Sequence, residues 1–138
     1  MIDFVNETDF AFDITLIETI ALDLSDQTIE LMLINDQAMR ELNKTARGID
    51  KTTDVLSFPI ADFPRAPLGS IVISVDAAVK QAQILGHSAD LEIAVLFLHG
   101  FLHLRGFDHE TDGNEMANEE LRLRKRYNLP VSLTERWR

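Results

Sequence analysis

The feature that most constrains this chain is the stretch Leu91–His109, LEIAVLFLHGFLHLRGFDH, which carries three of the four histidines. His99 and His103 stand four residues apart in an apolar run, so on a helix both imidazoles point to one side, about one turn apart. Gly106 can adopt a positive φ and end that helix, so that the chain folds back and brings His109 to the same point. Burying imidazoles without partners is costly, and the spacing therefore predicts a metal site rather than core histidines.

Three histidines can occupy three corners of a zinc tetrahedron and leave the fourth corner open for water. A water molecule in that position has its pKa lowered toward about 7, and an uncompensated dication suits an anionic substrate. Asp108, next to His109, is either a fourth ligand or an acceptor that orients a histidine ring. His87 lies outside the motif. The pattern favours one hydrolytic Zn²⁺ centre per chain, with nickel and iron as alternative ions.

The length and composition predict a single domain over residues 1–138, long enough to bury a core. The sequence contains no cysteine, which excludes a thiolate zinc site, a disulfide framework and a cysteine nucleophile. The first ten residues lack the basic and apolar regions of a secretory signal. The apolar run Ile93–Leu104 is too short to span a bilayer. We therefore expect a soluble, cytoplasmic protein with no membrane partner.

The net charge of −10 argues against a general affinity for nucleic acid, but the charge is unevenly distributed. Residues 1–60 hold 12 acidic and 4 basic residues, whereas residues 121–138 hold 6 basic residues and 1 acidic residue. The basic residues of this last segment are Arg122, Arg124, Lys125, Arg126, Arg136 and Arg138. A solvated helix face and tail explain this run better than a specific polyanion site does. A polyanionic ligand is allowed by the charge pattern but not indicated by it.

Hydrophobic periodicity predicts a chain of alternating strands and helices. Strands are expected at Ile2–Asn6, Thr28–Ile34, Val55–Phe58 and Leu68–Val75, the last two joined through Pro59, Pro64 and Pro67. Helices are expected at Phe12–Leu24 and Gly113–Tyr127, and a third runs from a cap at Asn35 to Asn43. A fourth helix starts at Ser74 or Asp76 and ends at Leu85, and a fifth starts after Ser88 or Asp90 and continues through the histidines. A polar loop is expected at Lys44–Thr53. This order predicts an α/β (α+β) fold, in which a small mixed β-sheet packs with about five helices and the metal site lies on a central helix.

The histidine spacing is compatible with two classes of enzyme. The histidines and Gly106 occupy the positions of the extended metzincin motif, H-E-x-x-H-x-x-G-x-x-H, and so make the motif distantly metzincin-like. The glutamate that serves those peptidases as general base is replaced here by Gly100. Because glycine cannot accept a proton, a metallopeptidase would need another base, and the sequence presents none.

The segment His99–His109, HGFLHLRGFDH, resembles the motif H-G-x-L-H-L-x-G-[YF]-D-H of the YbeY family, the bacterial ribosomal-RNA maturation factors. The resemblance extends over residues 42–109 and hardly includes the first 30 residues. Its upstream part consists of Leu42-Asn43, Arg47-Gly48, Thr53–Pro59, Leu68-Gly69 and Ile71–Ile73. The one clear departure is Ser70, which stands where the family commonly has an aspartate after Leu-Gly.

The resemblance implies an α/β fold with a mixed sheet and a metal-dependent, single-strand-specific endoribonuclease. It implies a role in small-subunit ribosomal RNA maturation, including processing of the 3′ end, and in ribosome quality control. By the same likeness, His99, His103 and His109 are the zinc ligands and Arg47 is the family's functional arginine. The implied partners are ribosomal RNA and the small ribosomal subunit, and the oligomeric state stays open.

Arg47 can also be considered from its neighbours alone. It is expected in a polar loop beside Lys44 and Lys51, two further candidates for substrate binding. Its guanidinium presents a planar fork of donors suited to phosphate, although an exposed arginine paired with Asp50 or Asp54 would look the same in sequence.

Together with the resemblance, these residues favour a zinc-dependent endoribonuclease that acts on single-stranded ribosomal RNA, with Arg47 on the scissile phosphate. The alternatives are a metallopeptidase and a non-catalytic ribosome-assembly factor with a structural metal.

Overall fold

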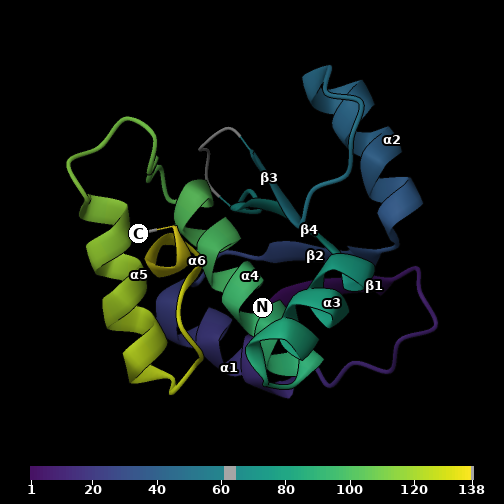
Figure 1. The fold of residues 1–138 in the computed structure, drawn as a ribbon. Helices are drawn as coiled ribbons and strands as arrows, with labels where there is room; N and C mark the ends of the chain where they lie inside the picture. The colour runs from purple at the N-terminus through teal and green to yellow at the C-terminus, as the bar shows by residue number, and fades with distance from the viewer. Residues whose placement is uncertain (61–64, 138) are drawn as a thin grey trace.

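The computed structural model describes residues 1–60 and 65–137 and has an α/β architecture (Figure 1). Pro64 and Arg138 lie outside the described residues. The elements, in order, are β1 (Ile2–Asn6), α1 (Thr15–Leu24), β2 (Ile29–Ile34), α2 (Asp36–Arg47), β3 (Val55–Pro59), β4 (Gly69–Ser74), α3 (Val75–Leu85), α4 (Ala89–Leu104), α5 (Glu115–Arg126) and α6 (Leu133–Arg136).

The four strands form one mixed sheet in the order β1-β2-β4-β3. Strands β1, β2 and β4 run parallel, whereas β3 pairs antiparallel with β4. The nearly continuous apolar sequence of β2 predicts an interior strand, and β2 does lie between two neighbours, with Ile29, Leu31 and Leu33 buried. The expected small mixed sheet is therefore confirmed.

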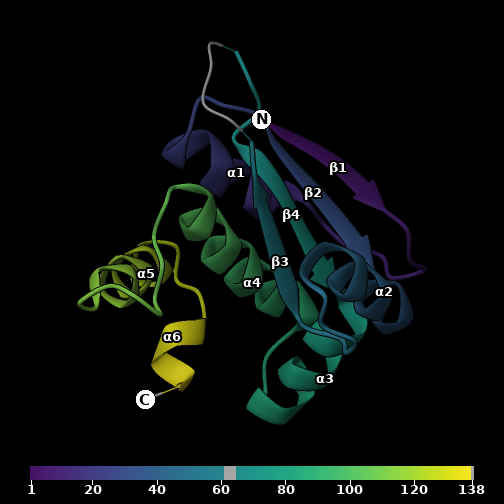
Figure 2. The ribbon, with the colours of Figure 1, turned by 90° about the horizontal axis from the view of Figure 1, so that it is seen from above.

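The helices cover the two faces of this sheet unequally (Figure 2). Helices α1, α3 and α4 lie on one face, where their apolar residues share the main core with Leu31 of β2 and Ile71 of β4. Helix α2 lies on the other face, where Met39 packs with Leu56 and Val72 in a smaller cluster. Helix α5 packs against α4 from the outside, so α4 is enclosed between the sheet and another helix.

Helix α4 forms the centre of the molecule and carries two of the three motif histidines. The Ser88 side chain accepts a hydrogen bond from the Leu91 N–H and caps its start, as the sequence predicts. Almost every residue from Glu92 to Leu104 is buried, in agreement with the unbroken apolar run. The chain leaves the helix through Gly106, whose φ of 92° lies in the left-handed region that favours glycine.

Helix α2 is longer than the sequence analysis predicts. The expected loop at Lys44–Thr53 is wrong in its first part, because the helix continues to Arg47. Gly48 ends it in the left-handed conformation and donates its N–H to the carbonyl of Lys44. Three residues of this last turn, Lys44, Ala46 and Arg47, are good helix formers, and the glycine cap stabilises the turn where polarity alone suggests a loop.

Helix α6 is absent from the sequence prediction. A capping box formed by Ser132 and Glu135 stabilises its first turn, and its four residues depend on contacts with α4 and α5. A helix of one turn has no periodic pattern that could identify it. In the described residues, no single helix is long and apolar enough to cross a membrane; α3 and α4 reach that length together but are bent by 114°.

At Gly100, α4 lies close against the sheet. A Cβ atom at this position would lie 2.9 Å from Cγ2 of Ile71 and 3.0 Å from Oγ of Ser57. The Ser57 hydroxyl also donates a hydrogen bond of 3.1 Å to the Gly100 carbonyl. Position 100 therefore faces β3 and β4, and a glutamate there would have to displace the packed sheet.

We expect the substitution Gly100→Ala to lower the melting temperature. Alanine gains about 1 kcal/mol of helix propensity over glycine, but overpacking of a close contact typically costs about 1–3 kcal/mol. Thermal denaturation followed by circular dichroism measures the net effect. Gly113→Ala is the matched control, because the nearest atom to its added Cβ is 3.6 Å away. An unchanged melting temperature for Gly100→Ala would contradict the close packing.

Candidate metal centre

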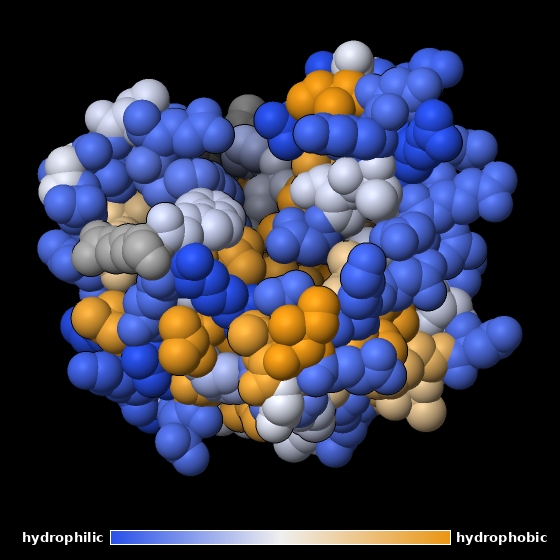
Figure 3. All heavy atoms as spheres, viewed as in Figure 1, coloured by the Kyte–Doolittle hydropathy of each residue, from blue (hydrophilic) through white to orange (hydrophobic). Residues whose placement is uncertain are grey.

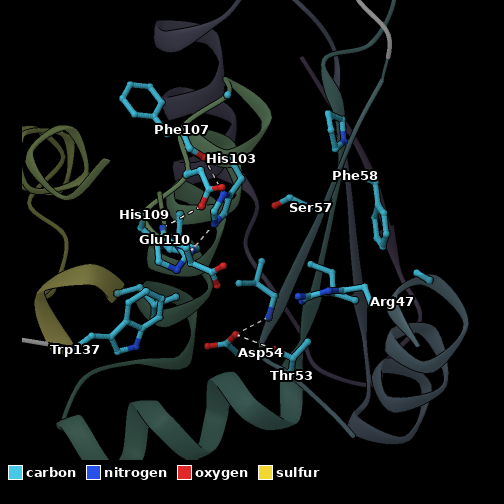
Figure 4. Close-up of a pocket in the computed structure, with 18 residues that line it drawn as sticks. Arg47, Thr53, Asp54, Ser57, Phe58, His103, Phe107, His109, Glu110 and Trp137 are labelled. Carbon is cyan, nitrogen blue, oxygen red and sulfur yellow. Dashed lines mark hydrogen bonds between the residues drawn. The ribbon is translucent and has the colours of Figure 1, made fainter. Parts of the chain in front are cut away.

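The structure brings the three motif histidines together. One ligand nitrogen from each of His99, His103 and His109 lies within 4.8 Å of the other two. The first two come from adjacent turns of α4, and the third follows the Gly106 turn (Figure 4). The predicted fold-back of the chain is therefore confirmed, and this group can hold a metal ion.

The outer nitrogens of the two helical histidines are held by acceptors. His99 Nδ1 lies 2.8 Å from Oε2 of Glu120, and His103 Nδ1 lies 3.0 Å from the carbonyl oxygen of Phe107. Each acceptor requires a proton on Nδ1, which leaves a lone pair on Nε2. The Nε2 atoms of the two rings are 3.2 Å apart. Two lone pairs at this distance repel each other unless a cation lies between them, and two nitrogens that share one tetrahedral zinc ion are separated by about 3.3 Å.

The protonation of these groups also suits metal binding. Burial lowers the pKa of His103, and repulsion from His99 lowers it further, against the opposing effects of the Phe107 carbonyl and the Asp108 carboxylate. Burial by itself would raise the pKa of Glu120, but the hydrogen bonds from His99 and Thr134 outweigh it and the net pKa is lowered. The lowered pKa of His103 favours its neutral, metal-binding form. An ionised carboxylate such as Glu120, behind His99, is a typical partner of a metal-binding histidine.

A cleft of about 770 Å³ opens in front of the histidines. Figure 3 shows the surface hollowed between the α2 side and the α5 side of the molecule. Its charged or polar lining residues are Arg47, Thr53, Asp54, Ser57, His99, His103, Asp108, His109 and Glu110. Phe58 and Trp137 contribute aromatic surface (Figure 4).

Arg47 lies across the cleft from the histidines, at the end of α2 (Figure 4). Neither of the two suggested partners pairs with Arg47: Asp50 binds Arg40, and Oδ1 of Asp54 accepts a hydrogen bond from the Val55 N–H. Within residues 1–60 and 65–137, no carboxylate pairs with Arg47. Its guanidinium is exposed and available to a ligand in the cleft.

The other candidate residues are placed less favourably. Lys44 and Lys51 are exposed and do not line the cleft. Asp108 lines the cleft, but its Oδ1 accepts a hydrogen bond from the Glu110 N–H and so stabilises the turn that contains His109. Ser70 lies away from the cleft, and its hydroxyl donates to the carboxylate of Glu30 on β2. An aspartate at position 70 would repel Glu30, which gives a local reason for serine there.

Two residues of the site escape the sequence analysis. Glu120 is buried on the face of α5 that also presents Met116 and Leu123, and a glutamate among apolar positions at helical spacing is a signal that could have identified it. Trp137 directly follows α6, and its ring centroid lies 4.8 Å from that of His109 and 5.6 Å from that of His99. No local pattern predicts this contact.

We expect Glu120→Gln to weaken metal binding about 10- to 100-fold, the usual effect of losing a partner behind a ligand. The carboxylate accepts from His99 through one oxygen and from Thr134 through the other. Glutamine keeps only one acceptor oxygen, so one of these donors would face an NH₂ group. Competition with a zinc chelator measures the affinity. Glu119→Gln is the control, since Glu119 binds Arg122 on the surface; equal affinities for the two variants would contradict the role of Glu120.

Comparison with known proteins agrees with this geometry. A relative named Endoribonuclease YbeY from a Nitratiruptor species is 56% identical over 134 residues, which cover 96% of this chain and 93% of the relative. The protein of the same name from Nautilia profundicola is 54% identical, with 99% of this chain and 98% of the relative covered. The one from Helicobacter pylori (strain ATCC 700392 / 26695) is 50% identical at the same coverage.

A solved structure shares the fold. The solution structure of TM1509 from Thermotoga maritima superposes with a TM-score of 0.60 at 25% identity, over 92% of this chain and 86% of that one. The family model described as Endoribonuclease YbeY matches residues 7–128, which include α4, the Gly106 turn and all three histidines. This chain therefore belongs to the YbeY endoribonuclease family.

Proposed function

We propose that this chain is a zinc-dependent endoribonuclease that cleaves single-stranded regions of ribosomal RNA. Family membership supports the endoribonuclease activity and RNA as its substrate. The observation that carries the proposal is the placement of three converging histidine nitrogens on one side of the cleft and, on the other, the guanidinium of Arg47, which pairs with no carboxylate of the described residues. The biological setting that we propose is maturation of the 3′ end of the small-subunit RNA and quality control of the ribosome in the cytoplasm.

The three histidines would hold the ion, because their inner nitrogens carry the free lone pairs. When bound, zinc supplies Lewis acidity toward water and phosphoryl oxygens. Arg47 would bind a phosphoryl oxygen of the scissile group from the opposite side and stabilise the negative charge that develops there. Its position at the end of a helix, rather than in a loop, restricts where its backbone lies relative to the histidines.

Two carboxylates in the cleft are placed to accept the proton of an attacking water molecule. Asp54 lies at the start of β3, and Glu110 directly follows His109. Their carboxylates point into the space between the histidines and Arg47 (Figure 4). We assign proton transfer to one of these two groups, which provides the general base that the sequence alone does not identify.

The alternatives fit the site less well. In the metallopeptidases with this histidine spacing, the general base occupies the position of Gly100, and here that position is packed against Ile71 and Ser57. A structural zinc ion normally has four protein ligands. The candidate group in the described part of the chain consists of three histidines, and Asp108 is not a member of it. An open coordination position favours catalysis over a purely structural metal.

Metal analysis of the purified protein should find one transition-metal ion per chain, and His103→Ala should lose most of it. The substitution removes one of only three converging nitrogens. His87→Ala is the matched control, because the His87 ring binds Glu92 at 2.7 Å and lies outside the group. A His103→Ala protein that retained a full equivalent of metal would refute the proposed centre.

Arg47→Ala should reduce RNA cleavage roughly a hundredfold or more, since losing one preorganised donor costs ~3 kcal/mol of transition-state stabilisation. Arg47→Lys should recover only part of the rate, because an ammonium group keeps the charge but loses the planar fork. Single-turnover cleavage of a defined single-stranded RNA measures these rates.

Metal content and melting temperature should stay at wild-type values in both Arg47 variants. Arg40→Ala is the control on the same helix, where the arginine binds Asp50 outside the cleft. Wild-type cleavage by a folded, metal-loaded Arg47→Ala protein would show that Arg47 does not contact the substrate.

A further inference from the structure

Trp137 is the only tryptophan of the chain, and its side chain lines the cleft while being 57% exposed. The other aromatic residues of the lining, Phe58 and Phe107, are half-buried. The indole lies beside His109 and His99 on the wall opposite Arg47 (Figure 4). A large aromatic face is thus presented next to the point where the scissile phosphate would bind.

The backbone that carries this indole is firmly held. Each of the three residues before Trp137 is anchored to a longer helix by hydrogen bonds. Thr134 donates to Glu120 of α5 through its N–H and its hydroxyl, at 2.9 and 3.1 Å. Glu135 and Arg136 form two-point ion pairs with other helices, as described next. The position of the indole is therefore fixed by tertiary contacts rather than by α6 alone.

Glu135 accepts two hydrogen bonds from Arg124 of α5, at 2.8 and 2.9 Å. Arg136 donates two to Glu92 of α4, at 2.7 and 2.9 Å. Glu92 is buried, and the Arg136 side chain is only 12% exposed, so this second pair is shielded from water. Contacts of this kind preorganise the aromatic surface before a ligand arrives.

The charge of the cleft makes such a surface useful to a protein that binds RNA. Among its lining residues, Arg47 is the only arginine or lysine, and the carboxylates of Asp54, Asp108 and Glu110 accompany it. The whole chain carries a net charge of −10. Attraction to the phosphate backbone outside the metal centre is therefore weak. Stacking of a nucleobase on an aromatic ring does not depend on charge and is tolerant of sequence.

We propose that Trp137 is a stacking platform for an unpaired nucleobase adjacent to the scissile phosphate. The inference rests on the proposed function, since it specifies how that site recognises its substrate. An indole reaches the face of a base only where the base is free of a duplex stack. The platform therefore selects single-stranded RNA by a physical contact and places its phosphate between the histidines and Arg47.

The single tryptophan makes the contact directly measurable. Metal-loaded protein is titrated with a short single-stranded oligonucleotide with 2′-O-methyl sugars, and the tryptophan fluorescence is recorded. Stacking should quench this emission. An oligonucleotide of the same length with abasic sites throughout, and the same sequence in a duplex, should leave the emission unchanged. Equal quenching by the abasic strand would overturn the proposal.

Binding measured by anisotropy of a labelled oligonucleotide gives the second readout. Trp137→Ala should bind the base-containing strand at least tenfold more weakly and no longer distinguish it from the abasic strand. Trp137→Phe should retain part of the discrimination. Val131→Ala is the control, because Val131 is a nearby exposed apolar residue outside the cleft lining. Undiminished discrimination in Trp137→Ala would show that the indole merely covers the histidines.

The two hypotheses fail in different ways. Base-dependent quenching by a protein that does not cleave RNA would support the platform and refute the proposed activity. Metal-dependent cleavage of RNA at the wild-type rate and affinity by Trp137→Ala would support the activity and refute the platform.

Discussion

The burial of α4 from Glu92 onward is the constraint on which the rest of this structure depends. The helix lies between the sheet, α3, α5 and α6, so the polar atoms on its buried faces are shielded from bulk water and need protein partners. The outer nitrogens of His99 and His103 find them in Glu120 and in the Phe107 carbonyl. Satisfying those two atoms turns the inner nitrogens toward one point. The geometry of the metal centre is thus a consequence of core packing.

The Glu120 carboxylate joins the metal centre to the neighbouring helix α6. One oxygen holds His99, and the other holds Thr134 at the start of the segment that carries Trp137. A four-residue helix is not stable by itself. Helix α6 therefore depends on this hydrogen bond and on the ion pairs that Glu135 and Arg136 form with α5 and α4. His99 and the segment that carries Trp137 are therefore held by the same carboxylate, which restricts the distance between the two rings.

In the part of the chain that the structure describes, the arginines of α5 and α6 are neutralised by ion pairs, whereas Arg47 is not. The arginines of α5 and α6 do not form a free basic patch, because Arg122, Arg124, Arg126 and Arg136 each lie within ion-pair distance of a carboxylate. These pairs leave little free positive charge on the C-terminal segment, although the Arg136 side chain is only 12% exposed and so is not part of a solvated face. Arg47 differs from them because, within the described residues, neither Asp50 nor Asp54 forms an ion pair with it. A chain with a net negative charge can bind a phosphate of RNA at a single cationic site without a broad basic surface.

The sequence by itself determined the features that rest on local rules. The apolar run fixed α4, the four-residue spacing fixed the direction of two imidazoles, and Gly106 permitted the turn that returns His109. Only the tertiary structure decided which groups support and face that site. Glu120 is 21 residues from His99, Arg47 comes from the other side of the sheet, and Trp137 follows a turn with no periodic pattern. Contacts between distant segments leave no trace in local periodicity, because they arise only when the elements pack.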